Sequence, residues 1–260
     1  MKIAILGAGA YGTAIGGILA EKGYDVDYYD ARLEREKLAD VVEGAAVIVL
    51  AVPSSAAPYV LPHLPKEKPL LVATKGILSL GAFHGFSDVM VMSGPGFADD
   101  IKARKRTKLT VTDGRLIELI GEEYFDYDLT DDVNGVLECG ALKNVYALGA
   151  GYKGLIAGSE EWEEYISRAV EEIRGILEFN GCEAETVELA CGIDDLKLTC
   201  DFPSRNYEFG MKFHADFNYR PEGTVEGLSV LKRIERGEIE VPGAAVLLKA
   251  IQIAMKSVKD

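Results

Sequence analysis

The fold of this chain is decided by the stretch Lys2-Ile3-Ala4-Ile5-Leu6-Gly7-Ala8-Gly9-Ala10-Tyr11-Gly12. Residues 3–6 form an apolar run typical of a buried strand, and residues 13–22 have the pattern of a helix. Between them the glycines follow the G-x-G-x-x-G spacing, which permits a tight turn, a close approach of a pyrophosphate and close helix–strand packing. A helix N-terminus adds amide donors and a positive dipole. The stretch therefore predicts a dinucleotide-binding turn.

Outward from this turn, short apolar runs alternate with helix-length segments up to about residue 128. Six further runs are predicted as strands, several of them continuously apolar as buried parallel strands are, at residues 26–29, 46–52, 70–73, 89–92, 109–112 and 124–127. Helices are predicted between them, among them residues 33–43 and 115–122. Alternating strands and helices predict the α/β class, with a Rossmann-like doubly wound sheet covered by helices on both faces.

The pattern changes after Asp131, where strand-like runs give way to long helical stretches. Asp131 and Asp132 can cap a helix N-terminus, and helices are predicted at residues 133–152, 160–180, 184–191, 225–236 and 243–257. We therefore predict two domains, a dinucleotide-binding domain at residues 1–129 and an all-helical substrate-binding domain at residues 130–260. A cleft between two such domains is a common place for a ligand.

The charge balance excludes several classes of partner. The 260 residues include 42 acidic and 28 basic side chains, a formal charge of −14. This is the wrong sign for a nucleic-acid binder or for a protein held on anionic lipid, so a phosphorylated substrate must meet a few local cations. No apolar run approaches the roughly 18 residues that span a membrane, and we expect a cytoplasmic protein.

The cysteines and histidines give no sign of a metal site. The 4 cysteines lack a C-x-x-C pair and the 3 histidines are scattered, so no metal is expected. Reduced, mostly buried thiols are the favoured interpretation, and a disulfide between two of the three later cysteines is the less favoured one.

Asp30 follows the second predicted strand, about twenty positions after the glycine turn. A carboxylate there can accept hydrogen bonds from the adenosine ribose hydroxyls and repel a 2′-phosphate, which favours NAD. Arg32 and Arg35 follow, and an arginine can pair with a 2′-phosphate. NADP therefore stays open.

Two lysines stand where they could take part in chemistry. Lys75 follows the strand at residues 70–73 and so lies at the carboxyl edge of the predicted sheet, or is an ordinary surface lysine. Lys143 lies in an otherwise apolar helix. Its side chain either reaches the surface or faces a cleft, where desolvation would lower its pKa into an acid–base range.

Two loops complete the set of candidates. Residues 93–98, Ser-Gly-Pro-Gly-Phe-Ala, form a small-residue turn that exposes backbone amides. The cluster Ser204-Arg205-Asn206 offers a hydroxyl, a planar fork of donors and an amide, which suit one phosphate. The other interpretation of this cluster is a capped turn.

Taken in order, these segments resemble the NAD(P)-dependent glycerol-3-phosphate dehydrogenase family of the bacterial type. The resemblance runs nearly end to end, through residues 7–14, 50–54, 73–77, 93–100, 130–151, 192–210 and 225–227. It implies reversible hydride transfer between NAD(P)H and dihydroxyacetone phosphate, giving sn-glycerol 3-phosphate for glycerophospholipid precursors. The implied partner is a small phosphorylated substrate, and neither nucleic acid nor a membrane is expected as a partner. A homodimer is possible.

The resemblance also implies roles for individual residues. Lys143 matches a proton acceptor, and Asp195 would orient it or balance its charge. Substrate-binding positions are Lys75, Gly94, Gly96, Lys143, Asp195, Ser204, Arg205 and Asn206. The predicted cofactor-binding set, from the motif and the resemblance together, is Gly7, Gly9, Ala10, Tyr11, Gly12, Asp30, Arg32, Lys75, Ala98, Arg205 and Glu226.

The chain also departs from the family pattern. Its first domain is short, Gly96 replaces a serine of the substrate loop, and Asp30 stands where the family commonly has a small residue. Two alternatives follow. One is another small-substrate reductase of the same build, of the ketopantoate or β-hydroxyacid type, which would not call for the Ser-Arg-Asn cluster. The other is a dinucleotide-binding sensor without turnover.

Overall fold

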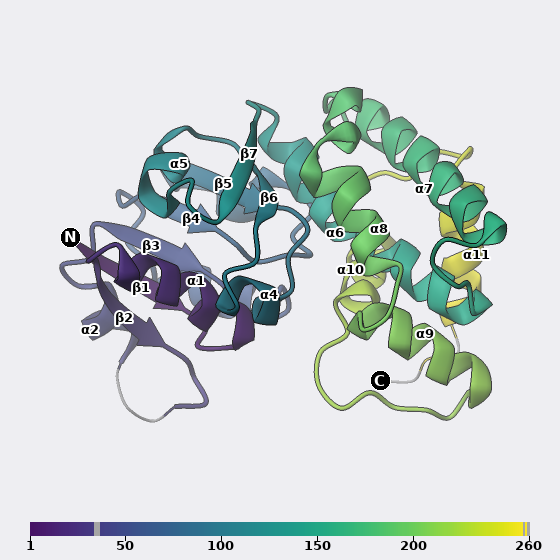
Figure 1. Cartoon of the computed structure of the whole chain (residues 1–260), viewed down its shortest axis with the longest axis horizontal. Helices are drawn as coiled ribbons and strands as arrows, with labels where there is room; N and C mark the ends of the chain where they lie inside the picture. Colours follow the sequence, from purple (N-terminus) through teal and green to yellow (C-terminus); the bar gives the residue numbers. More distant parts are fainter. Residues whose placement is uncertain (34–36, 257, 259–260) are drawn as a thin grey trace. The chain divides into compact units, whose positions relative to one another are not determined.

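The chain divides into two compact units in the computed structural model, which describes residues 1–33, 37–256 and 258. The sheet unit consists of Met1–Thr74 and Leu80–Val133, and the helical unit of Lys75–Ser79 and Asn134–Asp260. Figure 1 shows the strands of the first unit and the helices of the second. The short segment Lys75–Ser79 therefore belongs with the helices, although the residues on both sides of it belong with the sheet.

Within the described residues, the sheet unit holds a seven-stranded sheet in the order β2-β1-β3-β4-β5-β6-β7. The strands are β1 (Lys2–Leu6), β2 (Asp25–Tyr29), β3 (Val47–Leu50), β4 (Leu70–Val72), β5 (Val89–Ser93), β6 (Thr107–Val111) and β7 (Phe125–Leu129). All neighbours are parallel except β5 and β6. The predicted Rossmann-like α/β class is confirmed. The chain between β5 and β6 returns on the same edge, so these two strands run antiparallel.

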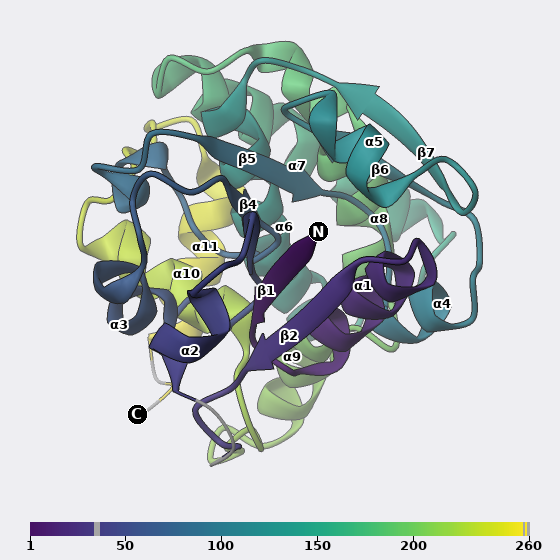
Figure 2. The ribbon, with the colours of Figure 1, turned by 90° about the vertical axis from the view of Figure 1, so that its left-hand side faces the viewer.

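Helices cover both faces of this sheet. Figure 2 shows α1 (Ala10–Glu21), α4 (Ala98–Lys102) and α5 (Arg115–Ile120) on one face, and α2 (Leu38–Val42) and α3 (Ala57–Val60) on the other. The apolar side chains of α1 pack on β1, where Ile3 and Ile5 are fully buried. Two short 3₁₀ turns lie in the connections, η1 (Leu61–His63) between α3 and β4 and η2 (Leu80–Phe83) between β4 and β5.

The strand order reverses at β1, which has β2 on one side and β3 on the other. In open α/β sheets, ligands bind at the carboxyl ends of the strands that flank such a switch point. The glycine turn directly follows β1, so the topology places it at this position.

The helical unit is built around α6 (Val133–Lys153), which is buried from Gly135 to Gly151. Around it lie α7 (Glu160–Phe179), η3 (Ala184–Glu188), η4 (Ala190–Asp194), α8 (Asp195–Thr199), α9 (Arg205–Ala215), α10 (Glu226–Glu235) and α11 (Val246–Met255). Two predictions were wrong here. Residues 184–191 form a 3₁₀ turn followed by a π turn instead of an α-helix, and α9 was not predicted.

Glycines let α9 approach α6 at backbone distance. A Cβ on Gly151 would lie 1.9 Å from the carbonyl oxygen of Tyr207, and a Cβ on Gly210 would lie 2.2 Å from the carbonyl oxygen of Leu148. Any side chain at either position would push the helices apart. This contact brings the start of α9 beside the middle of α6, where the candidate site lies.

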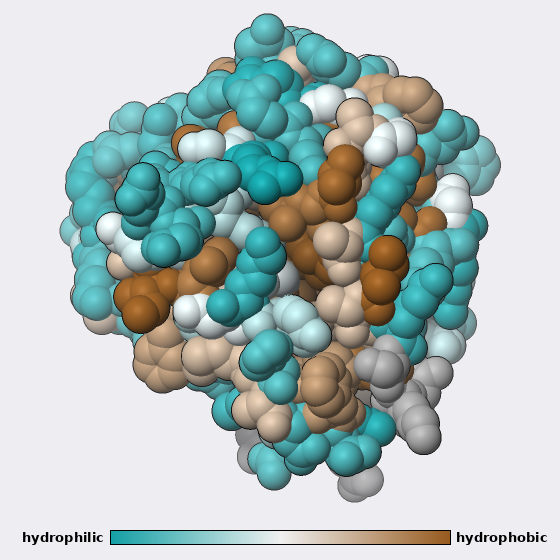
Figure 3. Space-filling model, turned by 90° about the vertical axis from the view of Figure 1, so that its right-hand side faces the viewer, coloured by the Kyte–Doolittle hydropathy of each residue, from teal (hydrophilic) through white to brown (hydrophobic). Residues whose placement is uncertain are grey.

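The surface carries scattered apolar side chains. Figure 3 shows brown patches among hydrophilic residues on one face. The exposed apolar residues of the helical unit include Phe179, Val246 and Ile253. No helix in the described part of the chain is both long and apolar enough to span a membrane. The four cysteines are thiols, and three of them are buried.

Candidate active site

The glycine turn between β1 and α1 is shaped by contacts that exclude side chains at two of its positions. Gly7 has φ +108°, and a Cβ there would lie 2.6 Å from the carbonyl oxygen of Ala51. A Cβ on Gly12 would lie 2.0 Å from the carbonyl oxygen of Gly7. At Gly9 no atom lies within 4 Å of such a Cβ, so the backbone there faces open space. Two glycines are thus required by packing, and the third leaves the room that a pyrophosphate needs.

The N-terminus of α1 is prepared for an anionic group. Gly9 is its N-cap, no side chain caps the helix, and the first turn has no acidic residue. The amides of the first turn therefore present the positive end of the helix dipole without a competing carboxylate. The residues of this turn fit a dinucleotide.

Asp30 is engaged through both carboxylate oxygens. Oδ2 accepts hydrogen bonds from the Ala8 amide at 3.1 Å and from Arg32 Nη2 at 2.6 Å, and Oδ1 accepts from Arg32 Nε at 2.8 Å. These hydrogen bonds from Arg32 outweigh partial burial and lower the pKa of Asp30 to about 2. Asp30 is therefore an anion at neutral pH and links the glycine turn to the end of β2. Arg35 lies outside the described residues.

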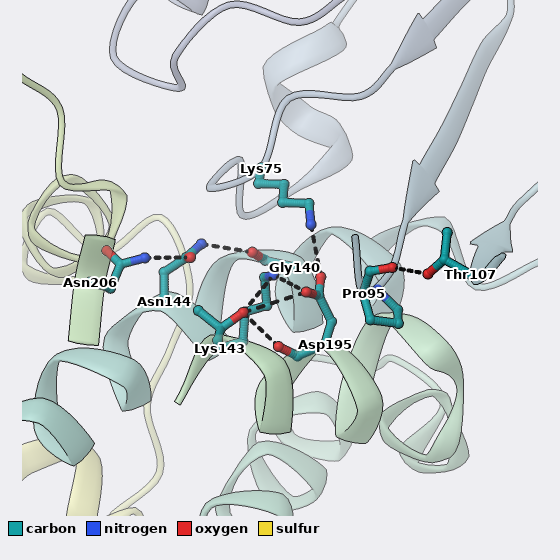
Figure 4. Close-up of polar contacts among 9 residues, drawn as sticks. Lys75, Pro95, Thr107, Gly140, Lys143, Asn144, Asp195 and Asn206 are labelled. Atoms are coloured by element: carbon teal, nitrogen blue, oxygen red, sulfur yellow. Dashed lines mark hydrogen bonds and ion pairs between the residues drawn. The ribbon is translucent and has the colours of Figure 1, made fainter. Parts of the chain in front are cut away.

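Lys143 points into the helical unit, with 4% of its side chain exposed. Its Nζ forms an ion pair with Asp195 Oδ1 and donates a hydrogen bond to Thr199 Oγ1 at 3.0 Å (Figure 4). The Thr199 hydroxyl in turn donates to the backbone carbonyl of Asp195 at 2.6 Å. Of the two orientations that the sequence left open, the structure shows the buried one.

Lys75 reaches the same carboxylate from a different segment. Its Nζ lies 3.0 Å from Asp195 Oδ2, and 22% of its side chain is exposed against 1% for Asp195. Asp195 thus holds one lysine on each of its oxygens (Figure 4). With all three groups charged, the cluster carries one net positive charge inside an acidic protein.

The environment of Lys143 favours its neutral form. Burial lowers the pKa of Lys143 to about 7, because a buried ammonium loses its hydration; Asp195 opposes this shift and Lys75 adds to it. The nearby Cys200 thiol stays protonated, since burial raises its pKa. Lys143 can therefore accept and return a proton near neutral pH, which an ordinary lysine cannot do efficiently.

A chain of amide hydrogen bonds lies beside Lys143. The Asn144 side chain donates to the Gly140 carbonyl at 3.0 Å and accepts from Asn206 Nδ2 at 2.8 Å (Figure 4). Asn206 Oδ1 accepts from the backbone amide of Gly227 at 2.9 Å. These bonds join α6, α9 and α10, so they fix the start of α9 relative to the lysine.

Ser204 and Arg205 stand at the N-terminus of α9. Ser204 is the N-cap residue, yet its buried side chain makes no capping hydrogen bond, so the cluster is not an ordinary capped turn. Arg205 is exposed and opens on a pocket of about 490 Å³. The pocket is also lined by cations and carboxylates, Lys212, Arg220, Glu208 and Glu222. The predicted Ser-Arg-Asn set is thus divided: Asn206 faces α6, and Arg205 faces this pocket.

The loop after β5 holds three more predicted residues, in the sheet unit. A Cβ on Gly94 would lie 2.7 Å from the Lys108 carbonyl oxygen, whereas one on Gly96 would make only ordinary contacts, the nearest at 3.5 Å. Gly96 therefore stands where a serine would also fit. Ala98 is the first residue of α4. The hydroxyl of Thr107 donates to the carbonyl of Pro95 and fixes this loop (Figure 4).

The predicted residues are divided between the two units. The sheet unit holds Gly7, Gly9, Ala10, Tyr11, Gly12, Asp30, Arg32, Gly94, Gly96 and Ala98; the helical unit holds Lys75, Lys143, Asp195, Ser204, Arg205, Asn206 and Glu226, the first residue of α10. Sequence reasoning assigned no role to Thr199 or Asn144. The spacing of four residues from Asp195 to Thr199, on one helical face, is the signal that could have found the first.

Three comparisons with known proteins bear on this site. Residues 132–252 match the family described as NAD-dependent glycerol-3-phosphate dehydrogenase C-terminus. The glycerol-3-phosphate dehydrogenase (NAD(P)+) of Leptospira biflexa is 32% identical, over 91% of this chain and 85% of that protein. The crystal structure of glycerol-3-phosphate dehydrogenase from Coxiella burnetii matches with a TM-score of 0.81 at 26% identity, covering 100% of this chain and 95% of that chain. A ketopantoate reductase from Ralstonia eutropha, at 17% identity and a TM-score of 0.54 over 98% of both chains, shares the fold alone.

Proposed function

Because this chain belongs to the NAD(P)-dependent glycerol-3-phosphate dehydrogenase family, we propose that it reversibly reduces dihydroxyacetone phosphate to sn-glycerol 3-phosphate. The observation that carries the proposal is the buried pair of Lys143 and Asp195, with Lys75 on the other carboxylate oxygen. The nicotinamide, when bound, supplies or accepts the hydride. The protein must supply a proton in one direction and remove it in the other.

Lys143 is the group that moves this proton. In the oxidation of glycerol 3-phosphate, the neutral amine accepts the proton of the C2 hydroxyl. In the reduction of dihydroxyacetone phosphate, the ammonium returns a proton to the oxygen at C2. A pKa close to neutral serves both directions, because each form of the amine is then populated.

The neighbours of Lys143 keep its amine in one place and control its charge. Asp195 and Thr199 bind Nζ from α8 and limit its rotation. Lys75 prevents Asp195 from holding Lys143 permanently protonated, since it shares the negative charge. An amine that is already oriented spends no entropy on finding the reacting oxygen.

The phosphate of the substrate fits the start of α9. Ser204 offers a hydroxyl that the helix does not use, Arg205 offers a guanidinium, and the helix N-terminus adds amide donors. An acidic protein of formal charge −14 can attract a dianion only through such a local set of donors and cations.

The cofactor would be held by the glycine turn, whose open Gly9 and uncapped α1 fit a pyrophosphate. Asp30 stands where a carboxylate can bind the ribose hydroxyls and repel a 2′-phosphate. Arg32, which could have paired with that phosphate, is bound to Asp30 instead. We therefore favour NAD over NADP for this chain.

The two alternatives explain less of the molecule. A ketopantoate- or β-hydroxyacid-type reductase does not call for donors suited to a phosphate at the start of α9. A non-catalytic dinucleotide sensor does not call for a buried lysine whose pKa is lowered. A homodimer and a cytoplasmic location stay predictions.

One assay tests substrate and cofactor together. Dihydroxyacetone phosphate is supplied with NADH and with NADPH in parallel, and oxidation of the reduced nicotinamide is followed by its absorbance. We expect faster turnover with NADH than with NADPH, and none with ketopantoate. Binding of the cofactor without turnover of dihydroxyacetone phosphate would support the sensor, and turnover of ketopantoate alone would support the other reductase.

A further inference from the structure

The segment Lys75–Ser79 has an unusual place in the chain. It belongs with the helical unit, although Thr74 before it and Leu80 after it belong with the sheet unit. Gly76, Ile77 and Leu78 are buried, and Gly76 has φ +93°. The segment carries Lys75, so whatever fixes its backbone also fixes where Lys75 starts.

Lys75 needs such fixing. Its side chain is long and has several rotatable bonds, and Asp195 holds it at the Nζ end. The peptide that joins Lys75 to Gly76 is planar, and only the φ and ψ rotations of Gly76 separate it from the Gly76 carbonyl. A hydrogen bond that holds the Gly76 carbonyl therefore limits the directions in which the Lys75 side chain can extend from the backbone.

Arg233, near the end of α10, holds that carbonyl. Its Nη1 donates a hydrogen bond to the Gly76 oxygen at 3.0 Å, and its Nε donates to Glu238 Oε2 at 2.7 Å. The side chain of Arg233 is only 14% exposed. A buried carbonyl requires a donor, and the rigid fork of a guanidinium can serve an oxygen and a carboxylate at once.

Glu238 is itself fixed to the end of α10, since its backbone amide donates to the Arg233 carbonyl at 3.2 Å. The other end of the same helix supplies the Gly227 amide to Asn206, whose side chain binds Asn144 next to Lys143. One helix thus contacts both sides of the cluster: Asn206 at its N-terminus and the Lys75 segment near its C-terminus.

We propose that Arg233 is a positioning residue of this enzyme, which binds the Gly76 carbonyl and so keeps Lys75 on Asp195. Arg233 acts through Lys75 and not on the substrate. The inference rests on the proposed function, because it requires that Lys143 moves the proton. Without Arg233, the Lys75 amine is held less firmly beside Asp195. The carboxylate then interacts mainly with Lys143 and favours its ammonium form.

Among the described residues, the groups that bind the Lys143 amine or shift its pKa most belong to the helical unit. Asp195 and Thr199 face it from α8, Lys75 faces it from the segment Lys75–Ser79, and the Cys200 thiol lies at the end of α8. The charge of Arg233 is balanced by Glu238. Loss of Arg233 should act on Lys143 through the place of Lys75. It also leaves Glu238 as an unpaired anion, whose field would raise the pKa of Lys143 too, so Glu238→Gln, whose field change has the opposite sign, separates the two effects.

The test compares Arg233→Met, Arg233→Lys and the control Arg236→Met, which removes an exposed arginine from the end of the same helix. Glycerol 3-phosphate oxidation is measured against pH, together with thermal unfolding. For Arg233→Met we expect kcat to fall roughly 10- to 100-fold, as misplacement of a reacting group by about 1 Å can cause. We also expect the midpoint of the pH profile to move upward. Arg233→Lys should recover part of both, because an ammonium can donate to the same carbonyl.

A purely structural role for Arg233 would lower the unfolding temperature without moving the pH midpoint, and this result would overturn the proposal. If Arg233→Met does not fold, Glu238→Gln decides: a smaller upward shift supports the proposal and an unchanged midpoint refutes it. Wild-type protein that does not turn over either substrate would refute the proposed function itself. Active wild type with an unaffected Arg233→Met would refute only the role of Arg233.

Discussion

The glycine turn of the sheet unit and the lysine cluster of the helical unit are built in opposite ways. The turn relies on backbone: two glycines whose Cβ atoms would meet carbonyl oxygens, one that faces open space, and an uncapped helix. The cluster relies on side chains that lie out of water, where Asp195 holds Lys143 and Lys75. The first region is one continuous stretch of chain, whereas the second is assembled from segments up to 120 positions apart.

This difference predicts separable failures. A change in the turn should weaken cofactor binding and leave proton transfer intact, because it alters the shape of the backbone alone. A change in the cluster should stop proton transfer and leave cofactor binding intact, because it alters a charge inside the helical unit. A variant of either region that impaired both cofactor binding and proton transfer would contradict this separation.

Lys143→Met should have the largest effect. It removes the amine that we propose moves the proton, so kcat should fall by roughly 10²–10⁴. NADH affinity, measured by fluorescence titration, should stay at the wild-type value. Lys197→Met, which changes an exposed lysine of α8, is the control and should keep wild-type kcat. Undiminished turnover in Lys143→Met would remove this residue from the mechanism.

Asp195→Asn should have the next largest effect, and on stability as well as on turnover. It leaves two lysines facing each other without a carboxylate, and loss of one partner of a buried ion pair costs about 3–5 kcal/mol of unfolding free energy. Lys143→Met should cost less, because Asp195 keeps Lys75 as its partner. Urea denaturation of the two variants gives the comparison, and equal stabilities would contradict this view of the cluster.

Gly12→Ala tests the other region. Its methyl group would press on the Gly7 carbonyl, and local strain of about 1–3 kcal/mol should weaken NADH binding roughly 10- to 100-fold. Gly17→Ala on the same helix is the matched control, since the nearest atom to its Cβ would be 3.7 Å away. If Gly12→Ala binds NADH as tightly as Gly17→Ala, the turn does not hold the cofactor.

Arg205→Ala should have the smallest of these effects. It removes one charged donor and leaves Ser204 and the helix N-terminus, so KM for dihydroxyacetone phosphate should rise about tenfold while kcat changes little. A KM equal to that of the wild type would place the substrate phosphate elsewhere.

The same contrast explains how much could be predicted from the sequence. The glycine turn and the strands are local patterns, and Gly7, Gly12 and the apolar runs adopt the expected structure. The burial of Lys143 could not be predicted, because it depends on the helices that surround α6. Those helices approach through glycines such as Gly151, whose meaning appears only with the packing partner.

Two further features escaped prediction for physical reasons. Helix α9 contains Gly210, which lowers helix propensity, yet the structure requires it for contact with α6. Arg233 binds the carbonyl of Gly76, the residue after Lys75, from 157 positions further along the chain. No rule of sequence spacing connects residues so far apart. The resemblance to a family indicated Lys75 and Asp195; the hydrogen bonds add Thr199, Asn144 and Arg233.

Burial and the charge of Lys75 together lower the pKa of Lys143 toward neutral. The most direct test is the pH dependence of kcat/KM for glycerol 3-phosphate oxidation, in the wild type and in Lys75→Met. Because the neutral amine accepts the proton, the rate should rise as the pH passes the pKa, with a midpoint near 7 in the wild type. Loss of the neighbouring positive charge in Lys75→Met should move that midpoint upward. Because both proteins are given the same substrate, titration of its phosphate does not account for a difference between them. A wild-type midpoint near the usual lysine value of about 10.4, or the same midpoint in both proteins, would contradict the account.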